Sequence, residues 1–169
     1  MAVTFEVETG TQSATANSFA SVANGDDYHA KHLYSEAWDD ADTTEKQEAL
    51  MMSTRLLDNH MQFEGIKASQ TQALQWPRHG ASDQGGYAID GDEIPQILID
   101  ATAELARLLL IDDRTAESPT MGFSRMKADV LDVDVDKFDR RPIIPGHIAD
   151  MLAPIGLVAG RTTGILVRA

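Results

Sequence analysis

The sequence contains no cysteine among its 169 residues. This absence excludes a disulfide scaffold, a thiol nucleophile and a zinc site with cysteine ligands. No run of about 18 uninterrupted apolar residues occurs either, so no membrane-spanning helix is predicted. Residues 1–10 also lack a basic segment followed by an apolar run, so we expect no signal peptide. The sequence therefore predicts a soluble protein that is made in the cytoplasm and does not enter a membrane.

Basic residues are scarce, because 14 Lys and Arg stand against 27 Asp and Glu, which gives a net charge of −13. Such a charge opposes the counterion release that drives most nucleic-acid binding. The negative charge is not spread evenly along the chain: residues 1–64 hold 3 basic and 12 acidic side chains, whereas residues 123–169 hold 7 basic and 6 acidic ones. A mildly basic C-terminal arm on an acidic body suits docking between copies or onto a partner. The alternative is that the negative charge simply keeps the protein soluble.

Apolar residues make up 43% of the chain, enough to bury a core in one domain of this length. Their helical spacing predicts helices over residues 44–61 and 95–111, and less regular ones over residues 21–32 and 147–158, the last kinked at Pro154. Thr43 or Thr44 is the expected N-terminal cap of the helix over residues 44–61. The fold class predicted from this pattern is mainly α, a small helical bundle with short β elements near the ends and an extended C-terminal arm.

Alternating apolar residues predict short strands at residues 3–7 and 130–136. Residues 66–94 form a long polar connection, which we expect Trp76 and Tyr87 to pin onto the body. We therefore divide the chain into one helical domain, residues 1–159 with the internal loop 66–94, and a C-terminal arm, residues 160–169.

Sequence motifs for catalysis are absent: there is no GxSxG, GxxxxGK, HExxH or GxGxxG pattern. The DVDVD run at residues 132–136 lacks the glycine and glutamate of a calcium loop, and a solvated strand face is the better interpretation. His29 and His32 lack two further zinc ligands, so surface histidines are expected. Trp76 beside Arg78 is the one local match to a single-stranded nucleic-acid site, although a packed tryptophan is the commoner explanation. We predict no enzyme, no metal and no cofactor.

An ordered set of residues over the first two thirds of the chain resembles the small connector, or adaptor, proteins of long-tailed bacteriophages, which also carry the label DnaT-like single-stranded-DNA-binding proteins. The set consists, in order, of Ser18, Phe19, Val22, Asp27, Tyr28, Trp38, Lys46, Ala49, Leu50, Thr54, Leu57, Asp58, Phe63, Gly65, Gln72, Leu74, Trp76, Pro77, Arg78, Ile94, Pro95, Ala101, Glu104 and Leu105. Within it, Trp76, Pro77, Arg78, Ile94 and Pro95 are family motif residues for which a structural role is expected. The sequence departs from the family where Asn24 and Gly25 replace a helix-favouring pair.

The resemblance implies a head-to-tail connector of the virion, a ring of twelve copies below the portal through which DNA passes without sequence-specific binding. Its implied partners are the portal protein, neighbouring copies of itself and a tail-terminator or tail-completion protein. By position, the partner-binding arm would comprise Arg161, Thr162, Ile165, Leu166, Val167 and Arg168. Candidate carboxylates for the channel wall are Asp132, Asp134 and Asp136, with a plain outer surface as the equal alternative.

Two other functions stay open. The family label favours a single-stranded-DNA-binding accessory of replication, which tight and salt-sensitive oligonucleotide binding would support. A third interpretation is a scaffold or chaperone module that remains monomeric.

Overall fold

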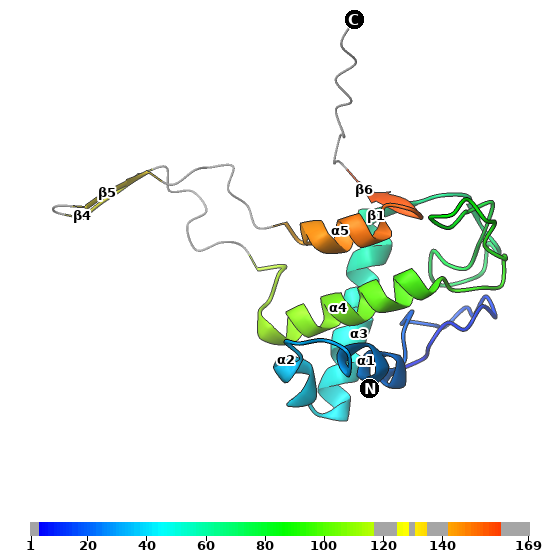
Figure 1. Cartoon of the computed structure of the whole chain (residues 1–169), viewed down its shortest axis with the longest axis horizontal. Coiled ribbons are helices and arrows are strands. Elements are labelled where there is room, and N and C mark those ends of the chain that lie inside the picture. Colours follow the sequence, from blue (N-terminus) through cyan, green and yellow to red (C-terminus); the bar gives the residue numbers. More distant parts are fainter. Residues whose placement is uncertain (1–3, 117–124, 129–130, 135–141, 160–169) are drawn as a thin grey trace, which may run out of the picture.

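The computed structural model describes residues 4–116, 125–128, 131–134 and 142–159. Its elements, in chain order (Figure 1), are α1 (Val22–His29), α2 (Glu36–Asp39), α3 (Thr43–His60), β1 (Met61–Phe63), β2 (Ile66–Lys67), β3 (Arg78–His79), α4 (Gln96–Ile111), β4 (Arg125–Ala128), β5 (Leu131–Asp134), α5 (Gly146–Leu152) and β6 (Gly156–Val158). The strands pair as three two-stranded antiparallel sheets, β1–β6, β2–β3 and β4–β5.

The fold of the described residues is therefore mixed α and β, and the prediction of a mainly α bundle is wrong. The reason is that strands two to four residues long do not give a sequence period that can be read. Three of them, β1, β2 and β3, lie in the middle of the chain rather than near its ends. No helix in the described ranges has both the length and the apolar character needed to cross a bilayer.

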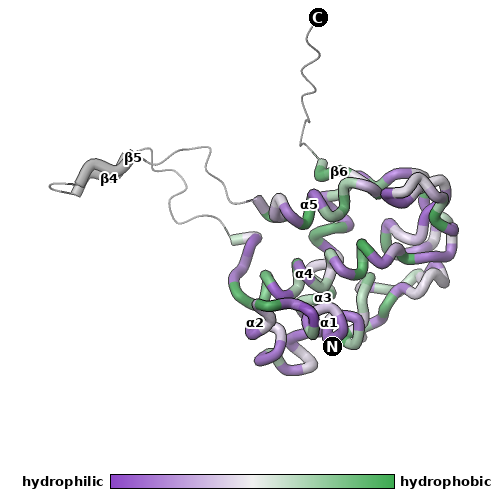
Figure 2. The backbone as a smooth tube through the Cα atoms, in the orientation of Figure 1, coloured by the Kyte–Doolittle hydropathy of each residue, from purple (hydrophilic) through white to green (hydrophobic). Residues whose placement is uncertain are grey.

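Helices α3 and α4 cross and pack against each other at the centre of the molecule (Figure 1). Their helical spacing brings Leu50 and Leu57 of α3 and Leu98 and Leu105 of α4 to full burial. Each such side chain contributes roughly 1.5–3 kcal/mol when it leaves water. Hydrophobic and hydrophilic residues alternate along these helices, as expected where one face is buried (Figure 2). The two predicted helices are confirmed, with bounds that differ by one residue.

The N-terminus of α3 is capped by Asp42 rather than by Thr43 or Thr44. The Asp42 carboxylate accepts hydrogen bonds from the N–H groups of Thr44 (2.7 Å) and Glu45 (2.9 Å), and Glu45 Oε2 accepts from the Asp42 N–H (2.9 Å). This reciprocal pair satisfies donors that have no partner inside the helix.

Helix α1 begins after Ser21, whose side chain forms a second capping box with Asn24. Gly25 faces the ring of the fully buried Trp38, and a Cβ at this position would lie 2.3 Å from Trp38 Cζ2. The departure from the family pattern at these two positions thus has a physical reason. The Asn24 side chain takes part in the cap of the helix, and the absence of a side chain at Gly25 leaves room for the indole of Trp38.

The segment 66–94 contains the β2–β3 ladder and a cis peptide bond between Trp76 and Pro77. Trp76 is fully buried against Phe63, with ring centroids 6.0 Å apart. Tyr87, however, is 76% exposed, so the expectation that it pins the loop is wrong. The carboxylate of Asp83 accepts the N–H groups of Gly85 and Tyr87 and forms a tight turn that leaves the phenol in solvent.

Helix α5 ends at Leu152, before Pro154, whereas the sequence predicted a helix to residue 158. The chain then forms β6, in which Val158 pairs with Met61 and Gly156 with Phe63. At the other end, the predicted strand at residues 3–7 is reduced, in the described part, to a single parallel bridge between Val7 and Ser18.

Candidate nucleic-acid interface

Aromatic rings gather where the chain leaves α1. We call residues 28–34 the aromatic turn: its rings contact one another in sequence, with centroids 5.0 Å apart for Tyr28–His29, 6.2 Å for Tyr28–His32 and 6.4 Å for His32–Tyr34. Burial falls along this series, from His29 at 1% exposed to Tyr34 at 66%. Leu33 beside them is also exposed. The turn therefore presents an aromatic and aliphatic surface to solvent on a buried base.

His29 forms that base. Its ring lies 4.9 Å from the Trp38 ring, and its Nε2 lies 3.1 Å from the carbonyl oxygen of Ala103. That nitrogen must be the donor, because a carbonyl only accepts. Burial lowers the pKa of His29, and its Nδ1 is without a partner among the described residues. His29 is thus a neutral packing residue, and the expectation of a surface histidine is wrong for it.

His32 holds the exposed half of the turn. The N–H of Tyr34 donates to His32 Nδ1 (3.1 Å), so in the neutral ring the proton is on Nε2. That Nε2 points at the carboxylate of Glu104, 3.7 Å from Oε2. The imidazole therefore connects the aromatic turn to the middle of α4.

Glu104 is the centre of a small charged cluster. Its side chain is 5% exposed, and Arg107 grips it with two hydrogen bonds, Nη2 to Oε1 at 2.6 Å and Nε to Oε2 at 3.3 Å. On the other side, Nε2 of His147, at the start of α5, lies 3.5 Å from Oε1. One carboxylate thus faces one guanidinium and two imidazoles.

Tyr28 lies beside this cluster and is half-buried. Burial raises the pKa of its phenol, the carboxylates of Glu104 and Asp100 raise it further, and Arg107 opposes them. The phenol therefore keeps its proton at neutral pH and can donate a hydrogen bond. With Lys31 exposed on the same turn, the surface combines stacking rings, a neutral donor and one cation.

Such a surface can bind a flexible polyanion with exposed bases. Bases stack on aromatic rings whatever their identity, while Lys and Arg attract phosphate. The charge of the surroundings limits this attraction, because Asp26, Asp27 and Glu36 lie on the elements that flank the turn. The contribution of stacking is therefore expected to outweigh that of phosphate contacts.

The family motif residues named from the sequence lie elsewhere, in the body. Trp76 is fully buried, Pro95 is the buried N-cap of α4, and Ile94 packs against the core. Arg78 is 8% exposed, and its guanidinium donates to four backbone carbonyl oxygens, those of Phe63, Glu64, Gly65 and Gln75. The Trp76–Arg78 pair thus closes the loop and offers no open stacking surface.

The remaining sequence-derived site residues are only partly described. Asp132 and Asp134 lie in β5, paired by register with Lys127 and Arg125 of β4. The candidates outside the described residues are Asp136, Arg161, Thr162, Ile165, Leu166, Val167 and Arg168.

Sequence reasoning missed the aromatic turn. A signal was present in the run Tyr28-His29-Ala30-Lys31-His32-Leu33-Tyr34, where four rings surround one lysine, a combination found in single-strand binding sites. The acidic residues around this run made a nucleic-acid site look unfavourable. The contact between His32 and Glu104 joins residues 72 positions apart, which the sequence does not reveal.

Comparisons with known proteins give one finding. A family model described as "Putative DnaT-like ssDNA binding protein" matches residues 3–169. Neither a curated protein nor a solved structure matches the chain. The predicted head-to-tail connector, with its place in the virion, is therefore wrong as the main interpretation: the family description favours the alternative, binding of single-stranded DNA. Channel-lining roles for the aspartates at 132–136 lose their basis with it.

Proposed function

We propose that this chain, which belongs to the family of DnaT-like single-stranded-DNA-binding proteins, binds single-stranded DNA on the aromatic turn and acts as an accessory of DNA replication. The observation that carries the proposal is the exposed ring of Tyr34 set among Leu33, Lys31 and His32. The role is one of binding: it uses no cofactor and no bond is made or broken.

Stacking supplies the main attraction in this proposal. The Tyr34 ring is 66% exposed, and His32, which accepts its backbone N–H, holds it on the turn. This hydrogen bond fixes the backbone that carries the ring, and a base can stack on the exposed ring. Each stacked base contributes roughly 1–3 kcal/mol. Bases in a duplex are stacked on each other already, so the turn should prefer single strands.

Phosphate contacts supply the smaller share. Lys31 is exposed on the turn, and Arg107 lies behind it but is held by Glu104. A single phosphate contact, that of Lys31, would give a slope of about −0.7 in log K against log salt. A shallow salt dependence is thus expected.

The test is fluorescence anisotropy of a labelled oligothymidine titrated with the full chain, with a duplex of equal length in parallel. Replacing Tyr34→Ala should weaken single-strand binding about 5- to 150-fold, the equivalent of one lost stacking contact. The matched control is Tyr87→Ala, because Tyr87 is as exposed but lies in the loop between β3 and α4. This control should leave affinity unchanged.

Two results would contradict the proposal. The first is equal affinity for duplex and single strand, which would remove the role of exposed bases. The second is an equal loss in the Tyr34 and Tyr87 variants, which would mean that the DNA binds without using the turn.

A further inference from the structure

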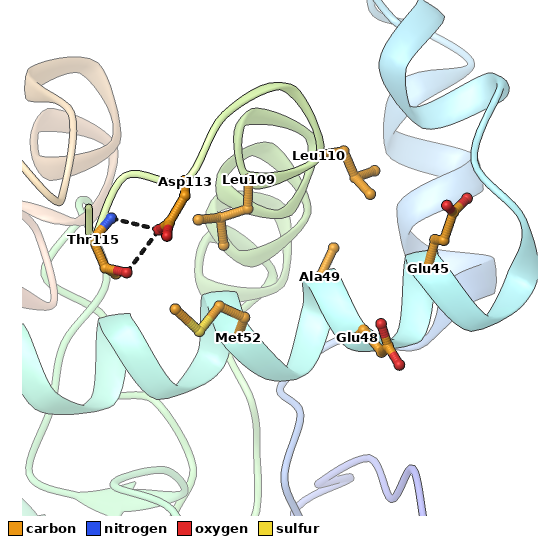
Figure 3. Close-up of a pocket in the computed structure, with 8 residues that line it drawn as sticks. All are labelled: Glu45, Glu48, Ala49, Met52, Leu109, Leu110, Asp113 and Thr115. Carbon is orange, nitrogen blue, oxygen red and sulfur yellow. Dashed lines mark hydrogen bonds between the residues drawn. The ribbon is translucent and has the colours of Figure 1, made fainter.

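A groove of about 320 Å³ lies between the N-terminal half of α3 and the C-terminal end of α4 (Figure 3). Its floor is apolar: Ala49 and Met52 of α3 face Leu109 and Leu110 of α4 across it. Met52 and the two leucines are only partly buried by the described residues. A cavity of roughly 150 Å³ holds one benzene ring, so a groove of this size accepts about two large apolar side chains. Covering such a floor is favourable, because it removes apolar surface from water.

The rim of the groove is acidic. Asp113 stands at one end, Glu45 at the other and Glu48 between them on α3, and all three side chains are exposed (Figure 3). Asp113 accepts hydrogen bonds from the N–H (2.8 Å) and the hydroxyl (2.6 Å) of Thr115, and the hydroxyl bond lowers the pKa of its carboxyl, so the group stays ionised. None of the three carboxylates forms an ion pair with another described residue.

The elements that build the groove restrict the shape of its occupant. Its walls are the sides of two helices rather than a strand edge, so an extended peptide would find no ladder of free N–H and C=O groups. A helix satisfies its own backbone and presents side chains i, i+4 and i+7 on one face. From Glu45 to Met52 the groove follows α3 for seven residues, about 10 Å at 1.5 Å per residue. Positions i to i+7 of a second helix cover the same length.

The charges at the groove select a basic occupant. One cation touches the floor: the guanidinium of Arg55 donates to the sulfur of Met52, beyond the end of the groove that Glu45 occupies. Carboxylates at the groove therefore outnumber this guanidinium by three to one. Lysine or arginine on the flanks of a docked helix would meet these carboxylates, whereas acidic flanks would be repelled by them.

We infer that the groove between α3 and α4 binds an amphipathic helix of a partner protein, with a two-turn aliphatic stripe on the floor and lysine or arginine side chains on the acidic rim. On α4, Leu109 and Leu110 lie five and six residues beyond Glu104, about 140° and 240° around the helix axis at about 100° per residue. The partner thus docks on the side of α4 opposite the carboxylate that contacts His32. Docking leaves the aromatic turn open and does not depend on DNA binding.

The test uses a fluorescein-labelled peptide of leucine, lysine and alanine, about 15 residues long so that it can form a helix. Three leucines are spaced i, i+4 and i+7, and the lysines flank them on both sides. One matched peptide has the same composition with its leucines spread around the helix, and a second has glutamate in place of lysine. In anisotropy titrations with the full chain, the striped basic peptide should bind at least tenfold more tightly than either, because it alone combines an apolar stripe with cations.

Two variants of the protein locate the binding. Glu48→Lys should weaken binding of the striped basic peptide about 2- to 30-fold, because an attraction between exposed charges becomes a repulsion. The matched control is Glu93→Lys: Glu93 is also exposed, changes the net charge by the same amount and lies before the opposite end of α4, so affinity should stay unchanged. Met52→Gln keeps the length of the side chain but makes the floor polar, and it should weaken binding with no change in charge.

Several results would overturn the inference. Equal affinity for the striped peptide and the one with spread leucines would show attraction to net charge alone. Equal losses in the Glu48 and Glu93 variants would place the peptide away from the rim, and no measurable binding of any peptide would exclude a helix as the occupant. A dimer in sedimentation that Glu48→Lys converts to a monomer would assign the groove to a second copy of this chain instead.

Discussion

Replacement of Glu104 by glutamine is the sharpest test of how the aromatic turn is anchored. The carboxylate is 5% exposed and holds Arg107, which is 10% exposed, through hydrogen bonds of 2.6 and 3.3 Å. Glutamine preserves the volume of the side chain but removes its charge. Its amide NH₂ would also face the N–H groups that Arg107 directs at this point.

The size of the effect follows from this burial. Removing one partner of a buried ion pair costs roughly 3–5 kcal/mol, because the other charge stays buried and unpaired. The lower end applies here, since His147 is 56% exposed and water can approach the cluster from its side. We therefore expect Glu104→Gln to lose about 3 kcal/mol. For a chain of 169 residues, this corresponds to a fall in Tm of about 6–12 °C.

The assay is urea unfolding followed by circular dichroism, with Arg107→Met and the double variant measured beside Glu104→Gln. The double variant should be more stable than Glu104→Gln alone, because it removes the unpaired charge and leaves an apolar side chain of similar length. A loss below about 1 kcal/mol for Glu104→Gln, the value typical of exposed pairs, would refute the reasoning. So would a double variant whose loss equals the sum of the two single losses.

Three further predictions concern stability. Burial raises the pKa of Asp58 although the N–H of Gln75 donates to its carboxylate at 2.8 Å, so the wild type loses stability as pH rises from the ordinary aspartate value through that raised pKa. Asp58→Asn should gain stability relative to the wild type as pH rises through the same range, and a difference in urea midpoints that stays constant with pH would contradict this. Arg78→Met should cost about 3 kcal/mol or more in the same assay, because four carbonyl groups lose their donor, and a loss below about 1 kcal/mol would count against it. Gly25→Ala should lower Tm by the equivalent of about 1–3 kcal/mol through its clash with Trp38, and an unchanged Tm would mean that the helix propensity of alanine prevails.

The sequence predicted α3 and α4 almost to the residue, because a long amphipathic helix repeats its apolar positions many times. The four-residue helix α2 offers no such repeat, and the three-residue ladder of β1 with β6 joins residues 61–63 to residues 156–158. A pairing of that kind is decided by tertiary packing and not by local preference. The helix predicted over residues 147–158 is confirmed as far as Leu152 and wrong beyond it for the same reason: after Pro154, pairing with β1 makes an extended conformation the better one.

The candidate site was harder to predict than the fold. Trp76 is a conspicuous aromatic residue near an arginine. Only the structure shows that its ring is buried and that the guanidinium of Arg78 donates its hydrogen bonds to backbone carbonyl groups. Tyr34 is an ordinary tyrosine in the sequence, and its value depends on exposure and on the hydrogen bond to His32. Exposure and distant partners such as Glu104 are properties of the folded chain, so residue type alone ranks these positions wrongly.

The net charge of −13 does not by itself exclude a DNA site, because charges act locally in salt solution. At physiological ionic strength the Debye length is about 8 Å, so carboxylates farther from the strand than this are largely screened. Near the turn, the exposed Lys31 is opposed by Asp26, Asp27 and Glu36 on the flanking elements, so little net attraction for phosphate remains. Stacking on Tyr34, in contrast, does not depend on ionic strength. An acidic protein of this design should therefore bind single strands weakly at first encounter and hold them mainly through their bases, with a salt dependence much shallower than that of basic DNA-binding proteins.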